Sequence, residues 1–175
     1  MLLLLSLAPA MAGAQPLVPP EVAAELPGAR QHGVGRMRFL GMRIYDARLW
    51  SASRLSRDDG WMQTALALEI EYARSLGGRA IAERSVEEMR RQAALSEEQA
   101  SRWLAAMIGI FPDVNQGDRI TAVHRPGEGL RFFVNQAARG EVRDPLFARL
   151  FLGIWLSSRT SEPALRDALL PAGSP

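Results

Sequence analysis

The chain has 175 residues, a length that fits one domain able to bury a core without help from a disulfide or a metal. It has no cysteine, which excludes disulfides, zinc–thiolate sites and thiol nucleophiles, and its two histidines do not favour a histidine-rich metal site. All 21 basic residues are arginines, but 19 acidic residues are interleaved with them and the net charge is only +2. No basic stripe indicates binding to nucleic acid.

The N-terminal segment has the features of a secretory signal peptide. Residues 2–7 form a leucine-rich run, and residues 8–14 supply the small side chains of a cleavage site. The run is far shorter than the ~20 apolar residues that a membrane-spanning helix needs. A positively charged start is missing, since no charged side chain precedes Glu21. We predict a signal peptide over residues 1–14, cut after Ala12 or Ala14, and export to the periplasm or the medium. The alternative is an N-terminal helix.

The next part of the chain changes from a leader to a strand. Residues 15–32 are rich in proline and alanine, and we expect a partly extended leader segment there. The domain itself is predicted to cover residues 33–172. Near its start Met37 and Phe39 alternate with arginines, and apolar residues on both faces continue to residue 50. This pattern predicts a central strand with Gly41 at a bulge or bend.

Two helices are predicted in the middle of the chain, after a second strand. Residues 66–73 alternate cleanly between apolar and polar side chains, which indicates a half-buried strand with one face in water. Ser85 and Ser96 each begin a capping box, the signature of a helix N-terminus. The second of these helices is expected to end at Phe111 and Pro112.

The remaining elements complete an α+β pattern. Residues 118–124 and 130–135 are predicted to form a hairpin, and a short strand is expected near Val142. Asp144 is expected to cap a nearly all-apolar helix, and Thr160 or Ser161 to cap the last one. Antiparallel strands at the start and towards the end, with helices between and after them, predict an antiparallel sheet covered on one face by a layer of helices.

Several segments are similar to the bacterial chalcone isomerase-like family. They cover nearly the whole chain after the signal peptide, in the same order as in the family. The matching segments are RMRFLGMRIYDA (36–47), LEIEYAR (68–74), SVEEMR (85–90), FPDV (111–114), GDRIT (117–121) and residues 144–166. The resemblance implies an open-faced β-sandwich, in which a large antiparallel sheet curls against a helical layer and a ligand cleft lies between them.

The resemblance also implies which residues face a ligand. The family includes enzymes that cyclise chalcones and fatty-acid-binding relatives without catalysis. Arg36 matches the arginine that orients the ligand oxygen in the enzyme, and Arg38 is the alternative, since a one-residue gap precedes Gly41. For Arg36 itself the alternative is an arginine at the surface of the sheet edge.

Other polar groups of the enzyme are replaced in this chain. By the same alignment a threonine of the enzyme becomes Ala47, a tyrosine becomes Gly77 and an asparagine becomes Arg84. The final polar contact, a serine or threonine before the last helix, has candidates in Thr160 and Ser161. Loss of several donors that stabilise a developing enolate argues against efficient cyclisation, because each is worth ~3 kcal/mol.

The sequence therefore favours an exported, non-catalytic protein that binds a small amphipathic carboxylate such as a fatty acid in an apolar cleft. Arg36 is expected to bind the carboxylate. Tyr45 and Tyr72 could add hydroxyl groups, although strand tyrosines more often only pack. The alternatives are an intramolecular lyase acting on a phenolic ligand, and a partner-binding protein without a cleft. We expect no cofactor, no nucleic-acid partner and no membrane span, and the sequence does not indicate an oligomeric state.

Overall fold

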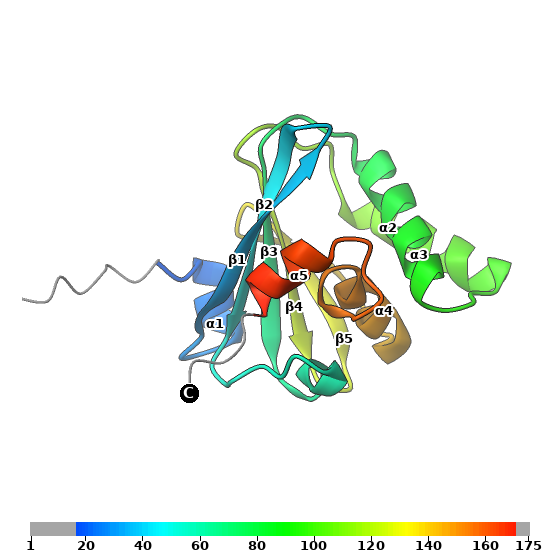
Figure 1. Cartoon of the computed structure of the whole chain (residues 1–175). Helices are drawn as coiled ribbons and strands as arrows, with labels where there is room; N and C mark the ends of the chain where they lie inside the picture. The colour runs from blue at the N-terminus through cyan, green and yellow to red at the C-terminus, as the bar shows by residue number, and fades with distance from the viewer. Residues whose placement is uncertain (1–16, 171–175) are drawn as a thin grey trace, which may run out of the picture.

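A computed structural model of the chain describes residues 17–170, which form one antiparallel sheet with helices on both faces (Figure 1). The predicted signal peptide, residues 1–14, lies outside the described residues. The sheet has the order β1-β2-β3-β4-β5-β6. Its strands are β1 (Arg30–Phe39), β2 (Met42–Ser51), β3 (Leu66–Tyr72), β4 (Arg119–Arg125), β5 (Gly129–Val134) and β6 (Ala137–Val142). The helices are α1 (Pro20–Glu25), η1 (Asp59–Gln63), α2 (Gly78–Gln92), α3 (Glu97–Ile110), α4 (Pro145–Leu156) and α5 (Pro163–Leu169).

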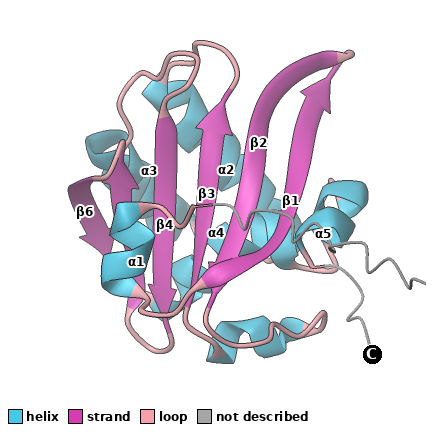
Figure 2. Cartoon of the chain, turned by 90° about the vertical axis from the view of Figure 1, so that its left-hand side faces the viewer, coloured by secondary structure: helices cyan, strands magenta, loops and turns pink. Residues whose placement is uncertain are grey.

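The two faces of the sheet are covered unequally. Helices α2 to α5 form a layer on one face, here called the inner face, and the short α1 lies on the opposite, outer face (Figures 1 and 2). Side chains alternate between the two faces along the strands, except at irregularities of register such as the one in β2 where Ile44 and Tyr45 both face the helical layer. No helix among residues 17–170 is both long and apolar enough to cross a bilayer.

Helix α4 forms the centre of the inner core. The Asp144 carboxylate accepts hydrogen bonds from the backbone N–H groups of Leu146 (3.0 Å) and Phe147 (3.2 Å), which confirms the predicted N-cap. Phe147, Phe151 and Trp155 follow one another at helical spacing on the buried side of the helix. Phe151 packs on Phe132 of β5 with ring centroids 5.4 Å apart, so the apolar stripe of α4 fixes the helix to the sheet.

Helix α5 approaches β1 closely at two glycines, Gly33 and Gly35, and its backbone leaves no room for a side chain at Gly33. A side chain on Gly33 would come within 2.3 Å of the Leu169 carbonyl oxygen, and one on Gly35 within 2.4 Å of Leu165. Neither glycine has a positive φ, so glycine is favoured at these positions by the lack of space for a side chain and not by the backbone conformation. Helix α5 therefore covers the first half of β1, with its backbone against Gly33 and the Leu165 and Ala168 side chains against Gly35.

The leader segment differs from the expectation, because part of it belongs to the fold. Residues 20–25 form α1, and β1 begins at Arg30, before the predicted domain boundary at residue 33. Val22 and Leu26 are buried in a second core on the outer face, formed with Ala29, Trp50, Ala67, Val123 and Phe133. The prediction that one face of β3 is exposed to water is therefore wrong. Glu69 on that face is 2% exposed and accepts a hydrogen bond from Trp50 Nε1 at 2.9 Å.

Three local predictions are wrong, each for a recognisable physical reason. Gly41 lies in a two-residue hairpin turn with Leu40, so the predicted central strand is two strands, with β1 at the sheet edge. Ser85 lies inside α2, where its hydroxyl donates to the Ile81 carbonyl instead of capping a helix. The N-cap of α5 is Glu162, without a side-chain cap bond, because Thr160 Oγ1 donates to the Ile154 carbonyl.

Other predicted elements are confirmed. Ser96 forms a complete capping box with Gln99 at the start of α3, and that helix ends at Phe111 as expected. The hairpin of β4 and β5 and the strand that ends at Val142 are also present. The capping residue Ser96 and the turn between β4 and β5 are thus local signals that the sequence predicts well.

We expect Gly33→Ala to destabilise the protein by about 1–3 kcal/mol, because the new methyl group overlaps the backbone of α5. The matched control is Gly109→Ala in α3, where nothing lies within 4 Å of the added carbon and helix propensity should raise stability by about 0.5–1 kcal/mol. Urea unfolding of both variants measures the effect. Equal stability of the two variants would contradict the close packing of α5 on β1.

Candidate functional site

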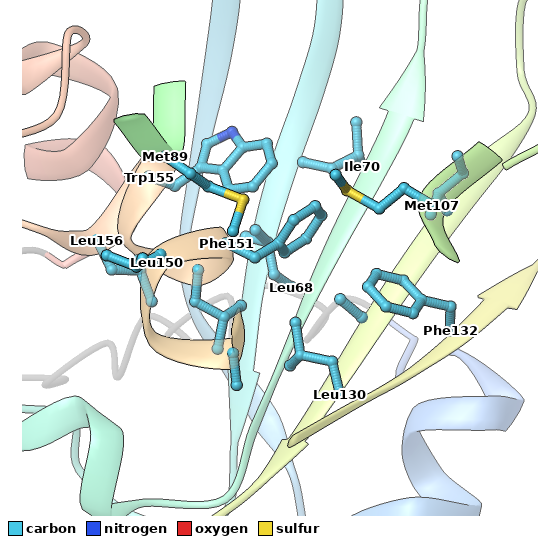
Figure 3. Close-up of a cluster of buried hydrophobic side chains, with 14 of the residues drawn as sticks. Leu68, Ile70, Met89, Met107, Leu130, Phe132, Leu150, Phe151, Trp155 and Leu156 are labelled. Atoms are coloured by element: carbon cyan, nitrogen blue, oxygen red, sulfur yellow. The ribbon is translucent and has the colours of Figure 1, made fainter. Parts of the chain in front are cut away.

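A cavity of about 450 Å³ lies between the inner face of the sheet and the helices α2 and α4. Strands β1 to β4 supply one wall, and the lining is mainly apolar, with Leu68, Ile70, Phe111, Ile120, Ala122 and Phe151 among its buried members. Figure 3 shows Phe151 of α4 beside Leu68 and Ile70 on the sheet. The volume and lining are typical of a site for a small organic ligand.

The cavity begins where α5 stops covering β1. Helix α5 covers Gly33 and Gly35, whereas Met37 and Phe39, further along the same face of β1, line the cavity. Phe39 is 59% exposed, so the cavity reaches the surface at the β1–β2 hairpin.

Tyr45 contributes a hydroxyl group to the lining. This hydroxyl accepts a hydrogen bond from Trp155 Nε1 at 2.9 Å, and both residues line the cavity. Among residues 17–170 it meets no acceptor for its own proton. Burial raises the pKa of Tyr45 to about 12, partly offset by the Trp155 hydrogen bond, so the phenol is neutral near pH 7 and can donate to a ligand.

Tyr72 lies next to Tyr45 across the β2–β3 pair. The two rings meet edge to face with centroids 6.2 Å apart, and both line the cavity. The Tyr72 hydroxyl has no hydrogen-bond partner within the described part of the chain, and burial raises the pKa of this phenol above its ordinary range. Two neutral phenols without acceptors thus face a mainly apolar space.

Charged groups of the lining are gathered around α2. Arg84 lies 2.5 Å from Glu88 Oε1, and Ser161 donates to the other oxygen of that carboxylate at 2.9 Å. Glu162 also lines the cavity. The Glu88 side chain is 7% exposed and that of Arg84 is 64% exposed, so the guanidinium lies at the mouth and the carboxylate inside. Arg84 also donates to the exposed Glu87 at 3.1 Å, so an anion would gain this guanidinium by competing with both carboxylates.

The structure brings together only part of the predicted site. Tyr45, Arg84 and Ser161 line the cavity, whereas Arg36 and Arg38 do not. Thr160 is also outside the lining, since its hydroxyl binds the Ile154 carbonyl at the end of α4.

Arg36 is on the outer face of the sheet, which corrects its predicted placement in the cleft. Its guanidinium donates two hydrogen bonds to Asp46, at 2.7 and 3.0 Å, and these raise the pKa of Arg36 and lower that of Asp46. Met37 lines the cavity, and strand alternation turns both of its arginine neighbours away from it. Arg38 donates to the Gly41 carbonyl at 3.2 Å.

Glu88 and Glu162 were missed by sequence reasoning. Arg84 and Glu88 are four residues apart, which places them on one helical face, and this signal could have found the pair. The interpretation of Ser85 as a helix start concealed it, because Arg84 would then lie before the helix. Within residues 17–170, no group of three or more His, Asp or Glu side chains is arranged to hold a metal ion.

Comparison with known proteins agrees with this architecture. The model of the chalcone isomerase-like family matches residues 30–171. The chain belongs to the chalcone isomerase-like family. The crystal structure of a fatty-acid binding protein from Arabidopsis thaliana superposes with a TM-score of 0.64 at 15% identity, covering 82% of this chain and 87% of that one. No curated protein matches the sequence.

Membership of the chalcone isomerase-like family confirms the predicted fold class. The six-stranded antiparallel sheet with its helical layer is the α+β arrangement that the resemblance implied. The space between sheet and helices is where that arrangement was expected to hold a ligand, and the cavity described above lies there.

The two tyrosines of the chain should titrate well above their ordinary pKa near 10 in the folded protein. The unfolded chain ionises near that value, so from about pH 10 to 12 the folded state binds more protons and the free energy of unfolding falls as pH rises. Tyrosinate absorbance in buffer and in denaturant measures both titrations. In Tyr45→Phe the remaining phenol of Tyr72 should keep the rise in pKa that burial causes and lose the smaller rise that the charge of Tyr45 causes. Tyrosinate formation near pH 10 by the native protein would contradict burial of these phenols.

Proposed function

We propose that the protein binds a small amphipathic carboxylate such as a fatty acid, with the tail in the apolar part of the cavity. The observation that carries this proposal is a mainly apolar cavity whose lining includes the donors Tyr45, Tyr72 and Arg84, which suit a carboxylate, beside the carboxylates of Glu88 and Glu162. The structural similarity to a fatty-acid binding protein supports the same ligand class.

The head group is assigned to the side of the cavity near Tyr45 and Arg84. Tyr45, Arg84, Glu88 and Glu162 all line the cavity, and Arg84 lies 2.5 Å from Glu88. The carboxylate accepts hydrogen bonds from the tyrosine hydroxyls, and Arg84 turns from Glu88 to the ligand. Glu88 keeps its hydrogen bond from Ser161 during this exchange. Leu68, Ile70 and Phe151 then surround the tail, which gains affinity from burial of apolar surface.

We also propose that this binding involves no turnover. Ala47, at the position where the enzymes carry a threonine, is fully buried and lacks a hydroxyl, and Gly77 lacks a side chain altogether. The alternative is an intramolecular lyase that uses the phenols of Tyr45 and Tyr72 on a phenolic ligand. Turnover of a chalcone by the purified protein, lost in Tyr45→Phe, would favour the enzyme.

Export to the periplasm or the medium remains part of the proposal, supported by the leucine-rich run and the small residues before Gln15. Fractionation of cells that express the full gene should place the protein outside the cytoplasm. N-terminal sequencing should then begin at Gly13 or Gln15. An unprocessed chain retained in the cytoplasm would overturn export.

For the ligand itself, we expect Arg84→Gln to weaken binding of laurate or palmitate by about tenfold or more, because one charge-assisted hydrogen bond is lost. Glu88→Gln should strengthen binding several-fold, because it removes the buried competitor for Arg84, leaves only the exposed and weaker competitor Glu87, and still accepts from Ser161. Isothermal titration calorimetry measures both. The corresponding fatty alcohols should not distinguish wild type from either variant.

The matched control is Arg36→Gln, which removes an arginine of the outer face and should leave the affinity unchanged. A loss of binding in Arg36→Gln equal to that in Arg84→Gln would reject the head-group assignment. Absence of binding to any fatty acid, with the fold intact, would reject the proposed function as a whole.

A further inference from the structure

The tip of the β1–β2 hairpin, residues 38–43 and hereafter the hairpin tip, exposes three large apolar side chains. Phe39 is 59% exposed, Leu40 83% and Met42 46%. The tip extends beyond the last pair between β2 and β3, Tyr45 with Tyr72, and it stands at the top of Figure 1 and at the upper right of Figure 2. Exposed apolar residues gathered at one projecting turn indicate an interaction surface.

The turn itself is unfavourable for the residue that occupies it. Phe39 pairs with Met42, so Leu40 and Gly41 form a two-residue loop, and both have positive φ, +49° and +78°. Asparagine or glycine fits the first of these positions, whereas leucine is strained there. Leu40 also contacts solvent over most of its surface, so folding gains nothing from it.

The charges beside the tip are also unfavourable for folding. Arg38 lies directly opposite Arg43 in the strand pair, an arrangement that destabilises a hairpin. Arg74 approaches as well, with its Nη1 atom 3.2 Å from the Met42 sulfur. With Arg36, four arginines surround the tip, and Asp46 is the carboxylate that pairs with two of them, Arg36 and Arg43.

We propose that the hairpin tip docks on the surface of an anionic lipid bilayer. Phe39, Leu40 and Met42 would enter the boundary between head groups and acyl chains, while the arginines contact lipid phosphates. Each arginine near such a surface adds to the attraction by about fivefold in the partition coefficient. Binding to an anionic bilayer accounts both for a leucine at a strained turn position and for two arginines opposite each other, neither of which stabilises the isolated fold.

A second copy of the chain fits the tip less well than a membrane does. In a symmetric pair the same patch meets itself, so the arginines of one tip would face those of the other. Like charges brought together in this way oppose association. A lipid surface instead supplies the negative charge that the tip lacks.

Docking would also place the cavity at the membrane, since Phe39 belongs both to the tip and to the cavity lining. This consequence rests on the proposed function: a ligand that partitions into lipid could enter the cavity without crossing water. Docking itself depends only on the tip, so the two can fail separately.

The test is flotation with vesicles of equimolar phosphatidylcholine and phosphatidylglycerol, against vesicles of phosphatidylcholine alone. Wild type should float with the anionic vesicles, and less so as salt rises. Leu40→Asn should bind roughly tenfold more weakly or worse, because a buried leucine side chain is lost. Asparagine suits the turn, so Leu40→Asn should be at least as stable as wild type in urea, which excludes misfolding as the cause.

The matched control is Leu146→Asn, which removes another exposed leucine, 42% exposed, near the opposite end of the sheet. It should float like wild type, and all three proteins share one N-terminus, whose contribution therefore cancels. Laurate affinity without vesicles should be the same in Leu40→Asn and wild type, which separates docking from ligand binding. Equal flotation of wild type and Leu40→Asn would overturn the proposal. So would a wild-type dimer that Leu40→Asn dissociates and that does not bind vesicles.

Discussion

The inner face of the sheet must be buried under the helices, and this requirement determines where the charged side chains can lie. Leu68, Ile70, Ile120, Ala122 and Phe132 make that face apolar across three strands. A charge among them would lose its hydration without a partner, which is far more costly than placing it elsewhere. Because strands alternate, the polar partners of these residues go to the outer face. There Glu69 and Asp46 bind the arginines that the inner face excludes.

The cavity is subject to the same requirement, because it lies between that apolar face and the helices α2 and α4. Polar groups can enter there without an isolated buried charge if they remain neutral or arrive in pairs. Tyr45 and Tyr72 satisfy the first condition, and Arg84 with Glu88 satisfies the second. The proposed head-group region thus lies between the buried apolar face and the surface, and the Arg84 guanidinium is its most exposed group.

The sequence predicts the layout better than the site, and particular residues show why. Asp144, Ser96 and the β4–β5 turn carry local signals, and those elements are where they were expected. Arg36 was placed in the cleft by alignment alone, although its alternation with Met37 already indicates opposite faces.

The remaining wrong predictions concern features that depend on tertiary contacts or on a misplaced helix start. The turn at Leu40 and Gly41 lacks the asparagine or glycine that usually occupies its first position, so the sequence carries no clear turn signal there. Val22 is buried against the outer face of the sheet, and a proline-rich segment does not by itself indicate such a contact. The Arg84–Glu88 pair was visible in principle as a helical spacing, but the misplaced start of α2 hid it.

The hydrogen bond from Trp155 to Tyr45 has a practical consequence. Trp155 lies in the wall of the cavity, whereas Trp50, Trp61 and Trp103 are fully buried and lie outside that wall. An occupant of the cavity would change the polarity around one indole and leave the other three unaffected. The emission spectrum of the unlabelled protein is therefore an internal optical reporter of whether the space between sheet and helices is filled with water or with hydrocarbon.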